Sequence, residues 1–333
     1  MVMKIFSAII LIIAILVLPV VSQNPNLGTA GAQFLKIPVG AQAAGMGGAF
    51  VAYTDDALGV FWNPAAITNV RSNSALFSHI QWFEMFDVNA VSYVHNFENL
   101  GTFGIGIMVL SMDEMEVTTE ASPNGTGRFF DAQDFAVSVS YARLLTNNFS
   151  AGLNIKFIHQ SIWNETASGI AFDVGTQYRI DFQNLVIAMS MLNFGPDMKL
   201  EGPDLSVKYD ANQFLNNRLL PTNLETEAYP LPLSFQIGLA FDLYNERFFK
   251  ARTSIDAVHP NDNDERIHFG LELAFFEILY LRGGYKFKHD DEAYNFGFGL
   301  RSFLGEFLLK VDYAYSVYNI LPDVHFITLG FDF

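Results

Sequence analysis

The residue types that most often carry out catalysis are scattered through this sequence. None of its histidines lies in a block with a nucleophile and an orienting acid, although a triad can also be assembled from distant segments. They stand at His79, His95, His159, His259, His268, His289 and His325. The chain has no cysteine, which excludes disulfides and cysteine-based zinc or iron–sulfur sites. Because no metal-ligand spacing appears either, we predict a protein that is not an enzyme and has no cofactor and no metal.

One glycine-rich block could in principle cradle a phosphate. It reads Gly45-Met46-Gly47-Gly48, but it lacks the spacing of the dinucleotide and Walker motifs and has no lysine. The neighbouring pair Asp55 and Asp56 could bind a cation or share a proton. Capping of nearby backbone N–H groups is the simpler prediction for these two carboxylates.

Two acidic stretches offer oxygen atoms, the ligands that calcium prefers. They are Asn261–Glu265 and Asp290–Glu292. We expect them to be ordinary solvated loops, which divalent ions could cross-link to lipopolysaccharide, rather than calcium sites.

The composition is too acidic for a nucleic-acid-binding protein. Lys and Arg total 19 against 35 Asp and Glu, a net charge of −16, whereas such proteins carry a basic patch. Half of the 333 residues are hydrophobic, 33 are phenylalanine and only 16% are charged. That balance fits neither a disordered chain nor a typical cytosolic enzyme.

Residues 1–22 have the layout of a secretory signal peptide. Lys4 supplies a positive charge, an apolar run follows over Ile5–Leu18, Pro19 ends it, and Val20-Val21-Ser22 provides small residues for a cleavage site. An uncleaved membrane anchor is the alternative, but the run is short for the roughly 20 residues that a spanning helix needs. The mature chain is therefore predicted to carry no transmembrane helix, yet it is unusually apolar.

Much of the remaining chain alternates with a period of two. In Tyr294–Arg301, aromatic or aliphatic residues at the even positions alternate with Asn, Gly, Gly and Arg at the odd ones. A helix would repeat every three to four residues, so such segments are predicted strands. We identify 14, an even number as in bacterial barrels: residues 74–82, 88–97, 101–112, 132–145, 148–160, 168–180, 184–194, 233–244, 247–258, 266–275, 278–288, 293–302, 306–316 and 324–333.

The two faces of these strands indicate a membrane barrel. A water-soluble sandwich also alternates, but its polar face is usually rich in charge. Here the polar face is Gly, Ser, Asn and isolated charges, and the other face is almost entirely Phe, Leu, Ile, Val and Tyr. The predicted fold is an all-β, 14-stranded antiparallel transmembrane β-barrel over residues 73–333, with lipid outside and a polar lumen.

The predicted connections alternate between tight turns and longer loops, notably 113–131, 195–232 and 260–265. Bacterial barrels have short periplasmic turns and longer outer loops, so this pattern places both chain ends on the periplasmic side. Loop 195–232 mixes leucines with acids and prolines, and it is predicted either to bind a partner protein or a greasy solute, or to fold as a lid on its own side chains.

Charged residues on the polar face are predicted to point into the lumen, because a charge facing lipid would be costly. They could line a polar path, clamp a plug, or pair with one another and keep the lumen hydrated; mutual pairing is the simplest expectation. These residues are Lys156, Asp173, Arg179, Asp242, Lys250, Arg252, Asp256, Glu272, Arg282, Lys286, Lys310 and Asp312.

The last predicted strand ends on an aromatic residue. Gly330, Phe331 and Phe333 close the sequence Phe326–Phe333, in which every second residue is apolar. This ending resembles the C-terminal signal that the outer-membrane barrel assembly machinery reads.

Residues 23–72 do not fit the strand pattern. They are rich in Gly and Ala, which allow close backbone approach, and Asn63-Pro64 is a turn starter. A lumen of 14 strands is too wide for its own side chains to fill. We therefore predict that this segment is a hatch packed inside the barrel, and we assign its motif residues as Gly45, Gly47, Gly48, Asp55, Asp56, Asn63, Pro64 and Ala65.

Several blocks of this segment resemble the PorV/PorQ family. They are Gly28–Ile37, Ala44–Ala52, Asp55-Asp56-Ala57 and Trp62-Asn63-Pro64-Ala65. That family is itself similar to the FadL type of outer-membrane transporter, whose 14-stranded barrel holds an N-terminal hatch with an Asn-Pro-Ala motif. The block Leu231–Leu233 with Gly238–Phe241 also resembles the family, and the remainder of the chain agrees in strand count and length only.

The resemblance implies two alternative roles in the outer membrane of a Gram-negative-type bacterium. A PorV-like protein would take part in type IX secretion or surface presentation, with secretion-system proteins and their cargo as partners. A FadL-like protein would pass hydrophobic small molecules through a hatch and a gap between strands. Membrane lipid and the barrel assembly machinery are expected partners in both cases, nucleic acid is not, and the fold alone does not choose between the roles.

Overall fold

The computed structural model describes residues 26–83, 85–209, 220–289 and 291–333. The predicted signal peptide, residues 1–22, lies outside the described residues. No helix in these ranges has the length and the apolar sequence that crossing a lipid bilayer requires.

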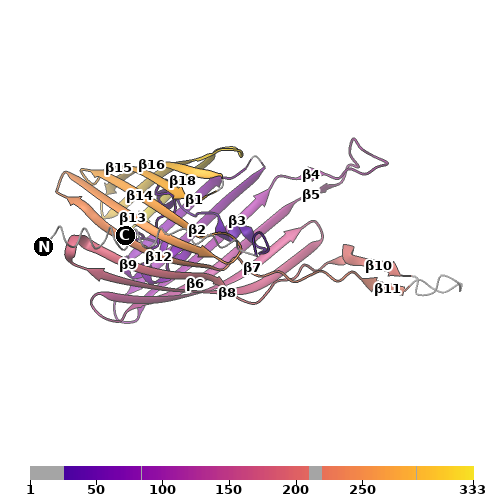
Figure 1. Ribbon diagram of the computed structural model, residues 1–333, viewed down its shortest axis with the longest axis horizontal. Coiled ribbons are helices and arrows are strands. Elements are labelled where there is room, and N and C mark those ends of the chain that lie inside the picture. The colour runs from indigo at the N-terminus through magenta and orange to yellow at the C-terminus, as the bar shows by residue number, and fades with distance from the viewer. Residues whose placement is uncertain (1–25, 84, 210–219, 290) are drawn as a thin grey trace.

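Fourteen strands of the described residues close into an antiparallel barrel (Figure 1), which confirms the predicted fold class. Strand β1 pairs with β18, so the ring is complete. The barrel strands are β1 (Asn73–Gln81), β2 (Phe86–Phe97), β3 (Gly101–Met112), β6 (Ala132–Leu144), β7 (Phe149–Ile162), β8 (Glu165–Ile180), β9 (Leu185–Phe194), β12 (Ser234–Asn245), β13 (Phe249–Pro260), β14 (Arg266–Phe275), β15 (Leu279–Phe287), β16 (Glu292–Leu304), β17 (Phe307–Tyr318) and β18 (Val324–Asp332).

Burial alternates along the strands as the sequence does. On β7, Asn154 and Lys156 are 1% and 5% exposed, whereas Leu153, Ile155 and Phe157 are 57%, 53% and 44% exposed. The outer wall therefore presents apolar side chains to its surroundings, as a barrel in lipid does. Most strand bounds lie within two residues of the prediction. The exception is the β7–β8 connection, because Ser161 pairs with Thr166 and Ile162 with Glu165, and only Trp163 and Asn164 remain between the strands.

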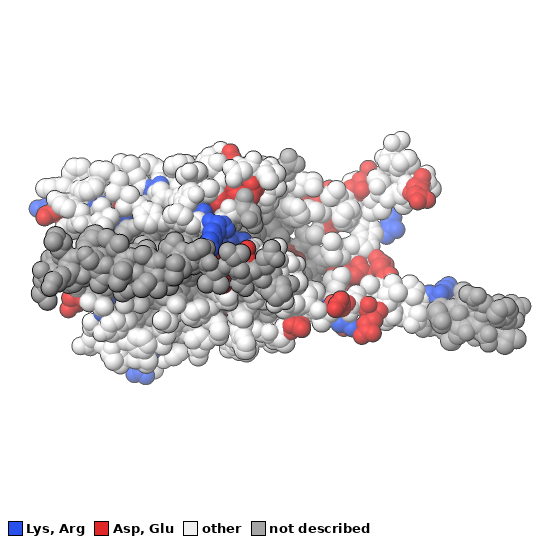
Figure 2. Space-filling view, viewed as in Figure 1, with Lys and Arg blue, Asp and Glu red and all other residues white. Residues whose placement is uncertain are grey.

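Connections at one end of the barrel, here called the turn end, are all short, and the long ones lie at the other, the loop end, together with the two-residue β7–β8 connection. Two hairpins project from the loop end (Figure 1): β4 (Met115–Glu116) with β5 (Phe129–Phe130), and β10 (Ser206–Tyr209) with β11 (Leu220–Asn223). Figure 2 shows acidic side chains gathered on these projections, while the visible barrel wall is mostly uncharged. Residues 113–131 alone hold five acids and one arginine.

The N-terminal segment, defined here as residues 26–72, lies inside the barrel. It contains η1 (Gln33–Lys36), α2 (Ala41–Gly45), α3 (Gly59–Trp62) and η2 (Pro64–Asn69). Helix α2 packs against β15 to β18, and η2 packs against β6, β7 and β8. Two further short helices lie elsewhere, η3 (Phe182–Asn184) at the turn end and η4 (Pro203–Leu205) in the long loop.

The described part of the N-terminal segment begins at the loop end, and the predicted position of the chain's N-terminus falls outside the described residues. The Gly28 N–H donates to the carbonyl of Asp262 over 3.0 Å, and the Gly31 N–H donates to that of Pro230 over 2.9 Å. Because the number of strands is even, Asn73 and the C-terminus lie at the same end of the barrel, the turn end. The strand count does not determine where a segment that runs the length of the lumen begins.

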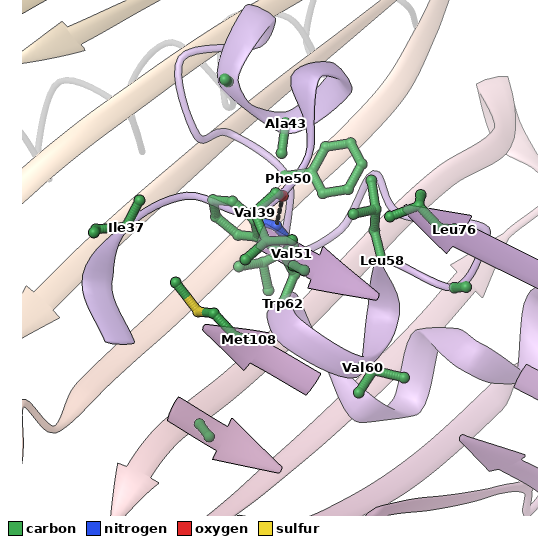
Figure 3. Packing of buried hydrophobic residues seen from close by; sticks show 14 of the residues in the cluster. Ile37, Val39, Ala43, Phe50, Val51, Leu58, Val60, Trp62, Leu76 and Met108 are labelled. Carbon is green, nitrogen blue, oxygen red and sulfur yellow. Dashed lines mark hydrogen bonds between the residues drawn. The ribbon is translucent and has the colours of Figure 1, made fainter. Parts of the chain in front are cut away.

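The hydrophobic core of the described residues is built largely on this segment (Figure 3). Phe50, Met46 and Ile67 are 0% exposed, and the Trp62 ring packs edge-on against Phe50 with centroids 5.6 Å apart. Met108 of β3 reaches the same cluster from the wall. The barrel is thus filled by its N-terminal residues together with inward side chains of its strands.

Candidate functional site

Glycines let the N-terminal segment touch the wall backbone to backbone. A Cβ atom placed on Gly284 of β15 would lie 2.1 Å from the Gly47 nitrogen, and one placed on Gly45 would lie 2.9 Å from the Gly297 Cα. Gly47 and Gly48 also have φ angles of 64° and 75°, which favour glycine. The glycine-rich block therefore serves close packing inside the barrel.

Asn63 joins three parts of the lumen. Its Oδ1 accepts from the Ala65 N–H over 3.0 Å and so caps η2, whose first residue is Pro64. Its Nδ2 donates to the carbonyls of Val51, over 3.1 Å, and of Thr176 on β8, over 3.3 Å. The side chain is fully buried.

Asn63→Ala is expected to lower the free energy of unfolding by about 2 kcal/mol. The change removes a helix cap and leaves two buried carbonyls without this donor. Urea-induced unfolding of the barrel in lipid vesicles, followed by tryptophan fluorescence, measures the effect. Asn148→Ala is the matched control, because the Asn148 hydrogen bond to the Arg179 carbonyl is exposed, and it should change stability by less than about 0.5 kcal/mol. Equal effects of the two substitutions would contradict the assignment.

The two neighbouring aspartates have different surroundings. Asp56 is buried, its Oδ1 accepts from the Leu58 N–H over 2.9 Å, and its Oδ2 lies 3.3 Å from Lys310 Nζ. Lys310 also contacts Asp332 Oδ2 at 2.7 Å. Asp55 is exposed to the lumen. Asp56 thus caps backbone N–H groups of the segment and ties it to β17 and β18.

A buried network joins the segment to β14, β15 and β17. Arg282 Nε lies 2.6 Å from Glu272 Oε2, and Arg282 Nη1 lies 2.6 Å from Asp312 Oδ1. The hydroxyl of Tyr53 in the N-terminal segment donates a hydrogen bond to Glu272. Burial, helped by the charge of Glu272, raises the pKa of the Tyr53 phenol well above its ordinary value, so the proton stays on the tyrosine.

Other charges predicted to face the lumen also hold the segment or pair across strands. The Asp256 Oδ2 accepts the Phe50 and Val51 N–H groups over 2.7 and 2.8 Å. The remaining contacts are Lys156–Asp173 at 2.9 Å, Lys286–Glu292 at 2.6 Å, Arg252–Asp242 at 3.6 Å and Arg252 over the Tyr53 ring at 4.7 Å.

Two of the charges assigned to the lumen stand apart from this network. Lys250 pairs with Glu277 in the β14–β15 turn, where both side chains are exposed. Arg179 is exposed at the turn end. Both residues lie near the ends of their strands, where the lumen opens to water, so an inward-pointing side chain there is not buried.

Sequence reasoning missed several charged residues of the lumen, among them four whose ion pairs are described here. Arg301 follows the alternation of its strand and contacts Asp312 at 2.9 Å. Asp332 also follows the alternation, and it contacts Lys310 at 2.7 Å. Glu292 lies where a register shift in β16 breaks the alternation, so its inward direction had no signal. Asp262 is the fourth.

Asp262 corrects the expectation of a solvated loop at 261–265. It is 2% exposed, it contacts Lys36 Nζ at 2.9 Å, and it accepts from Gln33 Nε2 over 2.8 Å. Its carboxylate fastens η1 to the β13–β14 loop. Among the described residues, no group of three or more histidine or acidic side chains could hold a metal ion.

The residues predicted as an assembly signal lie at the closing seam of the barrel. Gly330 faces Leu76 of β1, and Phe331 and Phe333 are exposed on the outer wall. The Phe333 carbonyl accepts from the Asn73 N–H over 2.9 Å. Recognition of this ending by assembly machinery stays a prediction.

A cavity of about 610 Å³ lies at the loop end, above η1 and α3. One side is aromatic: the Trp82 and Phe83 rings lie 4.6 Å apart, and the Tyr318 ring stands edge-on to Phe83 at 5.5 Å. The other side is polar and includes Gln236, Asn193, Lys156 and Lys286, together with Arg266 and Glu292. The lumen is therefore packed around the N-terminal segment and hollow near its outer mouth.

A family model described as "Type IX secretion system protein PorV" matches residues 20–255, which is more than two thirds of the chain. The chain belongs to the PorV family. No curated protein matches it. The match begins before the N-terminal segment and continues through β12 into β13, so the PorV family shares both the insert and most of the wall.

Solved structures with the same fold include a hydrocarbon channel, a FadL homologue and a toluene transporter. A deletion mutant of the TodX monoaromatic hydrocarbon channel aligns with a TM-score of 0.55 and 13% identity, over 88% of this chain and 99% of that one. A Pseudomonas aeruginosa FadL homologue gives 0.54 and 11%, over 89% and 98%. The Ralstonia pickettii toluene transporter TbuX gives 0.55 and 11%, over 88% and 96%. At these identities the likeness concerns the fold of this PorV-family chain.

Proposed function

We propose that the protein is a non-catalytic outer-membrane barrel that acts in type IX secretion or in the presentation of exported proteins at the cell surface. The observation that carries this proposal is the filled lumen. The N-terminal segment is held by buried ion pairs and by backbone contacts on several strands, so a solute could pass only if this core were displaced. Membership of the PorV family supports the same role.

In this role the loop end does the work. The β4–β5 and β10–β11 hairpins extend beyond the wall and expose acidic side chains, and backbone and side chains so far from the lipid are free to contact other proteins. Residues 113–131 and 195–233 are long connections of the kind that usually carries function. The barrel would anchor these surfaces in the outer membrane, and the N-terminal segment would act as a permanent hatch.

Deletion of the gene is expected to leave exported substrates in the periplasm, and affinity purification of the protein from outer membranes should recover other secretion components. The deletion strain complemented with the unmodified gene serves as the control. Normal secretion in the deletion strain would remove the proposal.

Passage of a hydrophobic solute is the second candidate, because the loop-end cavity has an aromatic side and the fold is shared with hydrocarbon channels. It requires the hatch to move. Substitution of Asn63 or Pro64 would then alter the uptake of fatty acids or hydrocarbons, and unchanged uptake in the deletion strain would count against this candidate.

A further inference from the structure

The outer wall changes from apolar to polar along one line of paired residues near the loop end. The line crosses neighbouring strands from β17 through the β1–β18 seam to β8. Its outward-facing members are Tyr315, His325, Gln81, Asp87, Ser111, Gln133, Ser161 and Thr166. The line four residues nearer the turn end is entirely apolar, with Val311, Leu329, Phe77, Val91, Ile107, Val137, Phe157 and Ile170. The polar line therefore marks where the wall leaves the hydrocarbon.

This polar line does not lie at one height in the membrane. The strands of such barrels tilt by about 35–45°, so paired residues rise from strand to strand around the wall. Gln81 lies 8 residues from Asn73, where β1 starts at the turn end, whereas Thr166 lies 14 residues from Ile180, where β8 ends there. The apolar band is therefore low near the β1–β18 seam and tall at β7 and β8.

Two hydrogen-bonded polar pairs enclose a short apolar band on the outer face of β1 and β2. At the turn end, Asn73 pairs with His95, and the Asn73 Oδ1 lies 2.6 Å from His95 Nδ1. Six residues further along β1, His79 pairs with Asn89, and the His79 Nδ1 lies 2.9 Å from Asn89 Oδ1. The outward-facing residues between the two pairs are Ala75, Phe77, Val91 and Tyr93.

This band is shorter than the hydrocarbon that a barrel normally meets. Six residues of strand span about 20 Å, or about 15 Å along the membrane normal at a tilt of 40°. On β7, 11 residues separate Asn148 from His159, which corresponds to about 28 Å along the normal. Bacterial barrels present an apolar band of about 25 Å. Hydrocarbon of that thickness around β1 and β2 would therefore cover at least one of the two polar pairs.

Asp87 indicates that the pair on the loop side lies outside the hydrocarbon. The Asp87 side chain is 52% exposed on the outer face, and its Oδ1 lies 4.0 Å from His79 Nε2. A band of about 25 Å measured from the Asn73–His95 pair would include Asp87, and a charge that faces hydrocarbon is costly. The His79–Asn89 pair is already hydrogen-bonded, so it needs only a polar surrounding and no protein partner.

We propose that the outer face of β1 and β2 is a contact surface for lipid head groups, at which the leaflet on the loop side thins beside the barrel. Head groups and water surround His79, Asn89 and Asp87 and bring the edge of the hydrocarbon down to Phe77 and Val91. The hydrocarbon beside β1 and β2 is then roughly 10 Å thinner than beside β7. This inference is independent of the proposed secretion role.

A single introduced cysteine can test the local thickness, because the chain has none of its own. Val91→Cys and Ile155→Cys are the matched variants: Val91 lies six residues from Phe97 and Ile155 six from Phe149, the turn-end limits of β2 and β7. Their side chains are 49% and 53% exposed on the outer wall. Each full-length barrel is spin-labelled in dioleoylphosphatidylcholine vesicles. Electron paramagnetic resonance then measures collisions with a water-soluble nickel complex and with oxygen, which prefers the hydrocarbon.

We expect the ratio of nickel to oxygen collisions to be about fivefold or more higher at position 91 than at position 155. His79→Leu with Asn89→Leu, added to Val91→Cys, should lower the ratio at position 91 at least about twofold, because it lengthens the apolar band. Heat-modifiable migration on gels confirms that each variant is folded.

Equal ratios at positions 91 and 155 would overturn the proposal, as would a double leucine variant that leaves the ratio at position 91 unchanged. The same labels are also measured in native outer membranes. A label at position 91 that is open to the nickel complex in vesicles but shielded from both reagents in native membranes would assign the surface to a protein partner, and the lipid contact would be wrong.

Discussion

Arg282→Leu is expected to lower the free energy of unfolding by about 3–5 kcal/mol, because it removes the cation that two buried carboxylates share. The Arg282 side chain is 0% exposed, and Glu272 and Asp312 lie 2.6 Å from it and are 7% and 3% exposed. Without the guanidinium, Glu272 must either stay charged without this partner or take up a proton, while Asp312 keeps only its contact with Arg301. Glu272, which accepts the Tyr53 hydrogen bond, would lose its ion-pair partner, so the N-terminal segment should loosen together with the wall.

Lys250→Leu is the matched control for this substitution. Lys250 also pairs across a strand boundary, at 2.5 Å from Glu277, but the two side chains are 40% and 62% exposed. Such a pair contributes less than about 1 kcal/mol. Urea-induced unfolding in lipid vesicles gives both values. Neutralising the acids as well, in Arg282→Leu with Glu272→Gln and Asp312→Asn, should restore part of the loss. If Arg282→Leu were no more harmful than Lys250→Leu, the buried network would have no stabilising role.

The second large effect is expected from Gly284→Val, which should dislodge the N-terminal segment and open a conducting path through the barrel. A Cβ atom at this position would lie 2.1 Å from the Gly47 nitrogen and 2.4 Å from the Met46 carbonyl carbon. Neither backbone can yield cheaply, because Met46 is fully buried and Gly47 packs directly on β15. The barrel itself keeps its hydrogen-bonded ring, and a 14-stranded lumen without its insert is wide enough for ions.

The neighbouring glycine provides the control. Gly283 faces the outside of the same strand, and no atom lies within 4 Å of a Cβ built on it. Gly283→Val should therefore leave the N-terminal segment in place. Conductance in planar bilayers compares the two variants, and trypsin cleavage at Lys36 or Arg71 reports whether the segment has left the lumen. Closed, protease-resistant barrels for both variants would show that the contact between Gly47 and Gly284 is not what seats the segment.

The strands could be predicted because one physical requirement acts on every second residue. Lipid outside and a polar interior repeat the same constraint along each strand, so segments such as Phe307–Tyr318 show it without help from tertiary context. Ser161 and Thr166 interrupt the apolar face near the loop end, and there the predicted bounds of β7 and β8 were short. Alternation therefore weakens where the wall leaves the apolar environment.

The candidate site was harder to predict, because its residues are brought together by the barrel and not by the sequence. Asp256 and Phe50 are 206 residues apart, and Lys310 and Asp56 are 254 apart. The alternation along each strand predicted that Asp256 and Lys310 point into the lumen, but it could not predict that their partners lie on the N-terminal segment. Glu292 and Asp262 lay outside any periodic signal, one at a register shift and one in a loop. The aromatic side of the cavity is assembled from two loop residues, Trp82 and Phe83, and from Tyr318 at the end of β17, and it was not predicted.

The course of the N-terminal segment has a consequence for biogenesis. Residue 73 starts a strand at the turn end, whereas Gly28, Gly31 and Lys36 are fastened to loops at the opposite mouth. The polypeptide is therefore threaded lengthwise through a ring that β1 and β18 complete. Feeding this stretch into a finished ring would drag Phe50, Trp62 and their neighbours past inward-pointing ion pairs. Formation of the sheet around the N-terminal segment, with β1 and β18 pairing last, avoids that passage. We therefore expect the N-terminal segment to be in place before the barrel closes.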